Sequence, residues 1–299
     1  MIKKYVFGTP FPTNAVVTEM ETAKDKLPFL ETDNQGTFNY ALSENDIVYG
    51  LGEQIRGINK RGWQYVSWNY DNPNHHEDTR SLYGSHNFIL IRGDVTFGAF
   101  FDYAGKMEFD IGYTRRDLMQ IKAAKNDLVV YIITGENEKD IVKQFRKIIG
   151  RSYIPPFWRS VTVRAVGVIR PSRTFARSQS GIRLLVFRWT AFIWTLTIWN
   201  ATRILPWTLS VFPNLKALAE DMKQQGIHLV PIIDAGVKIE KDYDVYEEGV
   251  QNNYFCKNAE DGDFVGAVWP GRVHFPDFLQ PDARKWFGKK YAVLTGTGY

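Results

Sequence analysis

Cysteine is almost missing from this 299-residue chain, since Cys256 is the only one. A single cysteine excludes an internal disulfide, and we interpret it as a structural thiol in a reducing compartment. The first residues, MIKKYVFGTPFP, contain no apolar signal-peptide core. We therefore expect a cytoplasmic protein, and the length favours two domains.

Long apolar runs are also scarce. The nearest candidate for a membrane span, residues 184–199, has 16 residues and is interrupted by Arg188. A spanning helix needs about 20 predominantly apolar residues. The sequence therefore predicts no membrane partner.

Acidic residues are missing from one segment, residues 159–211, which we call the acid-free window. Its 53 residues hold eight arginines and no lysine, aspartate or glutamate, whereas the rest of the chain holds all 33 acidic residues. The formal charge of +4 therefore comes from the window, because 29 basic residues face 33 acidic ones elsewhere. A basic, aromatic-rich surface could grip nucleic acid. That interpretation does not explain the sharp boundaries, and we predict no nucleic-acid partner.

Aromatic residues, in contrast, are plentiful at 15% of the chain, with nine tryptophans. Flat aromatic rings suit a protein that stacks on sugars, and they suit large cores equally well. Composition alone leaves both interpretations open.

The first part of the chain reads as an antiparallel β-sandwich. Short alternating or aromatic runs at 47–50, 88–91, 96–101 and 128–133 are separated by Gly, Asn and Asp. An amphipathic helix is expected at 136–149. Its predicted apolar side consists of Ile141, Val142, Phe145 and Ile148.

A connector follows this helix. Pro155 and Pro156 favour extended backbone, so we predict two domains at 1–150 and 151–299.

The second domain contains the clearest helix and strand. Leu215, Leu218, Ala219 and Met222 have helical spacing, with Asn214 as N-cap and Gly226 at the end. The apolar run 227–233 predicts a buried parallel strand that ends at Asp234, and a long loop is expected up to residue 278. Barrel enzymes keep their sites at such strand ends, although Asp234 could equally cap the turn.

A polar loop within 49–88 is the informative part of the first domain. Asp71, His75, His76, Glu77 and Asp78 lie close together there. Paired histidines beside carboxylates can bind metal, but adjacent ligands rarely point at one centre and no HxxxH spacing follows. We favour a solvated or ligand-facing loop, and we predict no metal and no cofactor.

Several motifs resemble glycoside hydrolase family 31, the α-glucosidase and α-xylosidase family. They are YGLGE, DTRSLYGSHNF, IPPFW, GIHLVPIIDAG, VWPG and FPDF, in the family's order, and the resemblance covers 1–158 and 212–294. It implies an N-terminal β-sandwich domain followed by α/β structure, an incomplete (β/α)₈ TIM barrel of which only the N-terminal half is present.

The resemblance also implies retaining hydrolysis of terminal α-linked glucose by the intact parent, with an oligosaccharide or α-glucoside as substrate. Such enzymes use two carboxylates about 5–5.5 Å apart. The family's nucleophile, in a WNDMNEP-type motif, and its acid/base would both fall beyond Tyr299. No catalytic residue is therefore assigned within the chain.

Four residues match substrate-binding positions of the family: Asp78, Asp234, Val237 and Trp269. By this resemblance Trp269 would stack on the cleaved sugar and Asp78 would accept bonds from its hydroxyls. The alternatives are a packing tryptophan and a solvated loop acid.

The genetic code offers an explanation of the acid-free window. Trp has only the codon TGG and Thr codons begin with AC, so every Trp-Thr pair contains GAC, an Asp codon, in a shifted frame. Such pairs occur at 189–190, 194–195 and 207–208. In that frame, residues 194–205 can be re-read as DIDYMERYKDFT, which resembles the family's second barrel strand motif. We infer a frameshifted segment at 159–211, and we expect it to be poorly packed and to show neither of the first two barrel strands.

The last residues, LTGTGY, fit a similar shift after Thr295. Two hypotheses follow from these observations. The intended product is an α-glucosidase of which this chain is a catalytically incompetent fragment. Alternatively, the chain is a non-catalytic carbohydrate-binding fragment or pseudoenzyme.

Overall fold

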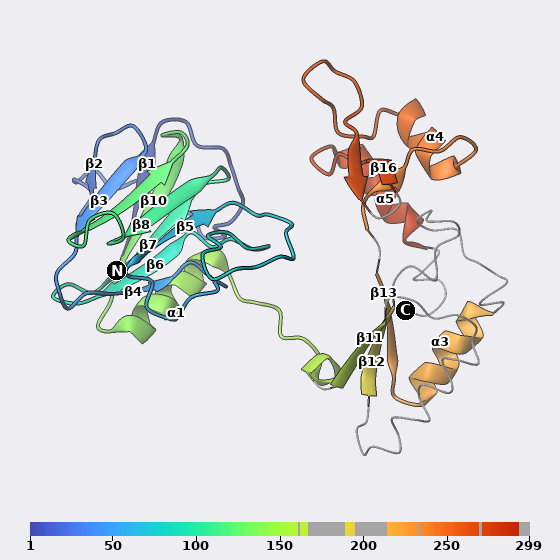
Figure 1. Ribbon diagram of the computed structural model, residues 1–299, viewed down its shortest axis with the longest axis horizontal. Helices are drawn as coiled ribbons and strands as arrows, with labels where there is room; N and C mark the ends of the chain where they lie inside the picture. Colours follow the sequence, from blue (N-terminus) through green and yellow to red (C-terminus); the bar gives the residue numbers. More distant parts are fainter. Residues whose placement is uncertain (161, 167–188, 195–213, 233, 269–270, 293–299) are drawn as a thin grey trace. The chain divides into compact units, whose positions relative to one another are not determined.

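The computed structural model describes residues 1–160, 162–166, 189–194, 214–232, 234–268 and 271–292. These residues form two compact units, Met1–Tyr153 and Ile154–Tyr299. The division falls beside Pro155 and Pro156, where extended backbone is favoured. Each unit is described by itself below (Figure 1).

The first unit contains two antiparallel five-stranded sheets. The first sheet has the order β1-β10-β7-β6-β4, and the second has the order β2-β3-β9-β8-β5. The strands of the first sheet are β1 (Ile2–Phe7), β4 (Ile47–Gly50), β6 (Phe88–Arg92), β7 (Phe97–Asp102) and β10 (Leu128–Thr134). Those of the second sheet are β2 (Glu31–Thr32), β3 (Thr37–Ala41), β5 (Trp63–Ser67), β8 (Met107–Ile111) and β9 (Leu118–Ala123).

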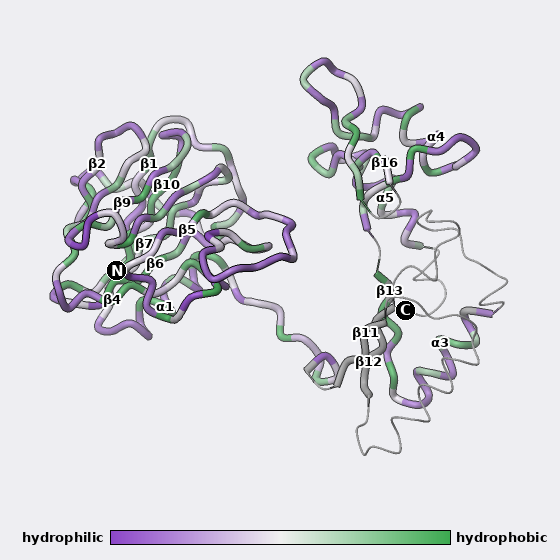
Figure 2. The backbone as a smooth tube through the Cα atoms, viewed as in Figure 1, coloured by the Kyte–Doolittle hydropathy of each residue, from purple (hydrophilic) through white to green (hydrophobic). Residues whose placement is uncertain are grey.

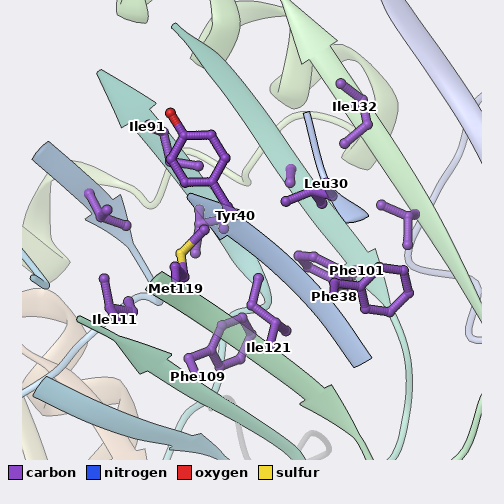
Figure 3. Close-up of a cluster of buried hydrophobic side chains, with 14 of the residues drawn as sticks. Leu30, Phe38, Tyr40, Ile91, Phe101, Phe109, Ile111, Met119, Ile121 and Ile132 are labelled. Carbon is purple, nitrogen blue, oxygen red and sulfur yellow. The ribbon is translucent and has the colours of Figure 1, made fainter. Parts of the chain in front are cut away.

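The main core lies between these two sheets. Phe38, Phe101, Phe109 and Ile121 are at most 1% exposed and belong to one cluster, shown in Figure 3. In β8 and β9 the buried residues alternate with more exposed ones, so one face of the second sheet packs in the core and the other faces outward. This is the β-sandwich that the sequence predicted.

Helix α1 (Glu138–Ile149) covers the outer face of the first sheet, which explains why β6 and β7 are buried on both faces. Asn137 is its N-cap, because its side chain accepts a 3.0 Å bond from the backbone N–H of Asp140. Phe145 stacks on Phe88 with ring centroids 4.0 Å apart. The helix was predicted correctly except for Val142, which is 42% exposed.

The second unit begins with a 3-10 turn, η1 (Phe157–Ser160), and a parallel three-stranded sheet of order β11-β12-β13. Its strands are β11 (Thr162–Val166), β12 (Trp189–Trp194) and β13 (His228–Pro231), with helix α3 (Leu215–Gln224) before β13. The helix and its Asn214 cap match the prediction, since Asn214 Oδ1 accepts from Ala217 N at 3.0 Å.

Two of these strands lie inside the acid-free window. The expectation that neither of the first two barrel strands would form is therefore wrong for 162–166 and 189–194, which pair in parallel with each other and then with β13. Both segments are rich in β-branched and aromatic residues, which suit a strand whatever frame produced them. The rest of the window lies outside the described residues.

A second, smaller sheet follows β13. Its order is β14-β16-β15, with β14 (Val237–Lys238), β15 (Gly266–Val268) and β16 (Gly271–His274), and helices α4 (Asp244–Gln251) and α5 (Pro281–Lys290) belong to the same unit. The long loop expected up to residue 278 is thus partly regular structure. Sequence periodicity missed it because these strands have only two to four residues each.

Candidate substrate-binding site

Asp78 lies in the loop that joins β5 to β6, and its side chain is exposed. Thr79 closes a turn on His76, with Thr79 N donating to His76 O at 3.0 Å and His76 N donating to Thr79 Oγ1 at 2.9 Å. The same loop is tied to β5 by Val66 N, which donates to Arg80 O at 2.8 Å. The loop therefore presents the Asp78 carboxylate to solvent from an anchored turn. Figure 2 shows that the loop between β5 and β6 is largely hydrophilic.

Aromatic side chains flank this carboxylate in sequence. Trp68, Tyr70 and Tyr83 are each about half exposed, at 52%, 54% and 51%. Partial burial, and after it a hydrogen bond to Asp71, raises the pKa of Tyr83. Half-exposed aromatic rings beside polar groups suit an amphipathic ligand such as a sugar. Sequence reasoning did not single out these three residues, although the stretch WNYD at 68–71 carried the signal.

The paired histidines of this loop do not form a metal site in the structure. Among the residues that the structure describes, no group of three or more His, Cys, Asp or Glu side chains could hold a metal ion. The ring of His75 instead meets the edge of Tyr83, with centroids 5.9 Å apart.

Asp234 follows β13 at the carboxyl end of the parallel sheet and is partly buried. The predicted strand 227–233 is shorter in the structure, where β13 ends at Pro231. The expected geometry at Asp234 nevertheless holds, because the strand before it runs parallel to β12. Side chains at this edge of a parallel sheet are the ones that barrel enzymes use to contact ligands.

Val237 is fully buried at the start of β14. It belongs to a cluster with Tyr243, Phe255, Trp286 and Phe287. Its partner across the sheet is His274, whose Nδ1 lies 2.7 Å from Phe264 O. The side chain of Val237 therefore has a packing role, and only its backbone could meet a sugar.

Trp269 lies outside the described residues. Of the other three predicted positions, Asp234 and Val237 are close in sequence within the second unit, and Asp78 belongs to the first unit. The role of each in sugar binding stays a prediction.

A polar groove in the first unit was missed by sequence reasoning. It has a volume of about 470 Å³, and Gln64, Asp110 and Gln120 are among the residues that line it. Polar residues at alternate positions in three neighbouring strands were the available signal, but β8 and β9 had not been recognised as strands.

No helix in the described part of the chain is long and apolar enough to cross a membrane. The described strands place a β-sandwich before a parallel α/β sheet, and Asp234 follows a parallel strand at the edge where barrel enzymes keep their sites.

Comparison with known proteins identifies the family. Residues 13–110 match the glycosyl hydrolase 31 N-terminal galactose mutarotase-like domain, and residues 183–297 match the TIM-barrel domain of glycosyl hydrolases family 31. The chain belongs to glycoside hydrolase family 31. The barrel match begins at residue 183, inside the acid-free window.

Two curated relatives are α-glucosidases. Alpha-glucosidase 2 of Bacillus thermoamyloliquefaciens is 34% identical over 266 residues, which cover 86% of this chain and 33% of the relative. The alpha-glucosidase of Saccharolobus solfataricus is 24% identical over 299 residues, which cover 96% of this chain and 42% of the relative. The chain thus spans between a third and a half of these relatives' lengths.

Solved structures show the same fold. A family 31 dextranase of Flavobacterium johnsoniae, complexed with isomaltotriose, superposes with a TM-score of 0.81 at 21% identity and covers 91% of this chain and 33% of the dextranase. The β-sandwich and partial TIM barrel predicted from the sequence are confirmed by this likeness and by the family models.

Proposed function

We propose that the intact parent protein is an exo-acting α-glucosidase that releases terminal α-linked glucose with retention. The observation that carries this proposal is the 34% identity to an α-glucosidase over 86% of the chain. The relatives named as α-glucosidases and the dextranase bound to isomaltotriose support an α-glucoside or oligosaccharide substrate.

The residues of this chain would bind the sugar without performing the chemistry. Asp78 and Asp234 would accept hydrogen bonds from sugar hydroxyls, because ionised carboxylates are strong acceptors. Trp269 would stack on the apolar face of the ring. Retaining hydrolysis needs a nucleophilic carboxylate and a second, protonated carboxyl about 5–5.5 Å from it. Our proposal assigns neither to residues 1–299, so the chain as written is catalytically incompetent.

The second part of the proposal concerns the acid-free window, which we propose is translated in a shifted frame. Its lack of any acidic residue and the Asp codons hidden in its Trp-Thr pairs support this.

Sequencing the DNA around the codons for Trp158, Phe212 and Thr295 tests the shifted frame. One base missing after Trp158 and one extra before Phe212 are the expected result. An intact reading frame there that agrees with independent copies of the gene would refute the proposal. The product of the repaired gene should then release the aryl group from an aryl α-glucoside.

A non-catalytic carbohydrate-binding fragment remains the second candidate for the chain as written. The exposed Asp78 carboxylate beside half-exposed aromatic residues favours it. Cytoplasmic location stays a prediction.

A further inference from the structure

The polar groove of about 470 Å³ lies on the outer face of the sheet that contains β5, β8 and β9. Tyr65, Phe109 and Ile121 point into the sandwich core. Because side chains alternate along a strand, Gln64, Asp110 and Gln120 point to the opposite face. The volume falls within the range of about 300–1,000 Å³ that is typical of small-molecule sites.

Three side chains of the groove are aligned across the sheet. Gln64 pairs with Asp110, Asp110 pairs with Gln120, and Gln120 pairs with Asn39 on β3. Gln64 Nε2 donates to Asp110 Oδ2 at 2.8 Å, and Gln120 Nε2 donates to Asn39 Oδ1 at 3.1 Å. The row is therefore ordered before any ligand arrives, which lowers the entropic cost of binding.

Asp110 is held in place more firmly than the other two. Its Oδ1 accepts from the backbone N–H of Tyr113 at 3.0 Å and of Thr114 at 3.1 Å, and its Oδ2 accepts from the Thr114 hydroxyl. Burial acts to raise the pKa of Asp110, but the hydrogen bonds from Thr114, Gln64 and the backbone outweigh it and hold the pKa below its usual value. These four hydrogen bonds occupy both oxygens of Asp110, so the ionised carboxylate serves as an anchor that orients Gln64 and Thr114.

The groove contains charges of both signs, with Arg80, Arg115 and Lys122 against Glu108 and Asp110. Glu108 on the groove pairs with Lys106 at 2.6 Å, and Arg115 pairs with Asp117 at 2.9 Å. Two apolar side chains, Val66 and Leu118, lie among the polar ones. Ordered amides, small apolar patches and charges of both signs suit a polyhydroxylated ligand better than an apolar peptide.

The groove also adjoins the Asp78 loop. Arg80, two residues from Asp78, lines the groove, and its backbone oxygen accepts from Val66 N on β5. A chain of sugars that reaches the loop would therefore find the groove at the loop's base.

We propose that this groove is a non-catalytic binding site for an α-linked gluco-oligosaccharide, separate from the positions at which the terminal glucose would be cleaved. The identity of the sugar rests on the proposed function. The groove itself rests on the aligned row of Gln64, Asp110 and Gln120 within the first unit.

Titration of the full 299-residue chain with maltoheptaose and with isomaltoheptaose, followed by calorimetry or by tryptophan fluorescence, tests the proposal. The doubly substituted Gln64→Ala/Gln120→Ala chain should bind about tenfold more weakly, since each sugar hydrogen bond contributes a few-fold in affinity. Asn39→Ala is the matched control, because it breaks the same bond to Gln120 without removing a residue of the groove. It should change the affinity less than about threefold.

A second variant separates the groove from the proposed cleavage site. Asp78→Asn/Asp234→Asn removes the charges predicted to hold the terminal glucose and should leave the groove's affinity within about threefold. If this variant no longer binds sugar and Gln64→Ala/Gln120→Ala binds as before, the groove is not a sugar-binding site. The proposed function would still stand. Equal losses in Asn39→Ala and Gln64→Ala/Gln120→Ala, with reduced thermal stability in both, would show a structural role only and would overturn the proposed site. If the chain binds neither maltoheptaose nor isomaltoheptaose, the proposal that the groove binds sugar is also wrong.

Discussion

The two units of this protein close their cores in different ways. In the first, two five-stranded sheets cover each other and α1 covers one outer face, so Phe38, Phe101 and Ile121 are buried from both sides. In the second, the described parallel sheet has three strands, with β11 and β13 at its edges. Parallel sheets occur almost only with both faces covered by helices. We therefore predict that the first unit folds by itself and that the second is the less stable of the two.

Self-association is the largest effect that this difference predicts. No strand of the described residues pairs with the outer edge of β11 or β13, and open sheet edges pair with other chains, so we expect the full chain to form concentration-dependent aggregates. Residues 1–153, expressed alone, should be monomeric and melt cooperatively. Size-exclusion chromatography with light scattering compares the two. If the full chain is monodisperse and melts cooperatively, the predicted difference in stability between the two units is wrong.

The core of the sandwich can be broken by one substitution. Phe38 is fully buried and meets Phe7 and Phe101 edge to face at 5.3 and 5.4 Å. Phe38→Ala should lower the free energy of unfolding of the first unit by about 3–5 kcal/mol. Phe11, which is 66% exposed, provides the control, and Phe11→Ala should change it by less than about 0.5 kcal/mol. Denaturant unfolding of residues 1–153 measures both, and equal effects would contradict the proposed core.

Gly50, in the YGLGE motif, tests how tightly the edge of the first sheet is built. Its φ is +115°, and an added Cβ would lie 2.2 Å from the carbonyl oxygen of Phe88. Gly50→Ala should therefore cost about 1–3 kcal/mol of stability. Gly57→Ala is the control, because a Cβ there meets nothing within 4 Å. A melting temperature unchanged by Gly50→Ala would show that β4 can shift without cost.

The smallest effect is expected in the second unit, where Lys290 on α5 donates to Glu248 on α4. This hydrogen bond, before any other cause, lowers the pKa of Glu248. A lowered pKa in the folded state means that the pair stabilises above the unfolded pKa of Glu, about 4.3, and that this stability is lost as the pH falls through the folded value.

The side chain of Glu248 is 44% exposed and that of Lys290 is 22% exposed. Because solvent screens such a pair, it should contribute at most about 1 kcal/mol to the free energy of unfolding. Glu248→Gln should lower the melting temperature at pH 7 and have no effect near pH 2. The partially exposed pair of Lys106 and Glu108 in the first unit serves as a reference. An effect of Glu248→Gln that is the same at both pH values would exclude an ionic contribution.

Sequence reasoning predicted the elements whose apolar pattern is strong. The runs that became β4, β6, β7 and β10 were found because they are almost continuously apolar or aromatic, and helices α1 and α3 were found because their apolar residues recur at helical spacing. Strands β8 and β9 were missed, although Glu108, Asp110, Gln120 and Lys122 alternate with buried apolar residues, which is the pattern of a half-buried strand. The groove was missed with them, since its residues only come together when these strands pair.

The candidate site was predictable in part. Asp234 at a parallel strand end followed from the apolar run before it, and Asp78 from the family resemblance. The burial of Val237 did not follow, because the short strand β14 and its pairing with His274 depend on residues far along the chain. The acid-free window was recognised from composition, yet its two strands formed where apolar and β-branched residues favoured them.

We propose that this chain carries sugar-binding positions of family 31 and neither carboxylate of its catalytic pair. The most direct test is to incubate the purified 299-residue chain with an aryl α-glucoside and to measure release of the aryl group against a buffer blank. Our account predicts no release above the blank. Turnover that is abolished by a covalent inhibitor of retaining α-glucosidases would show that a nucleophilic carboxylate is present after all, and would contradict the claim.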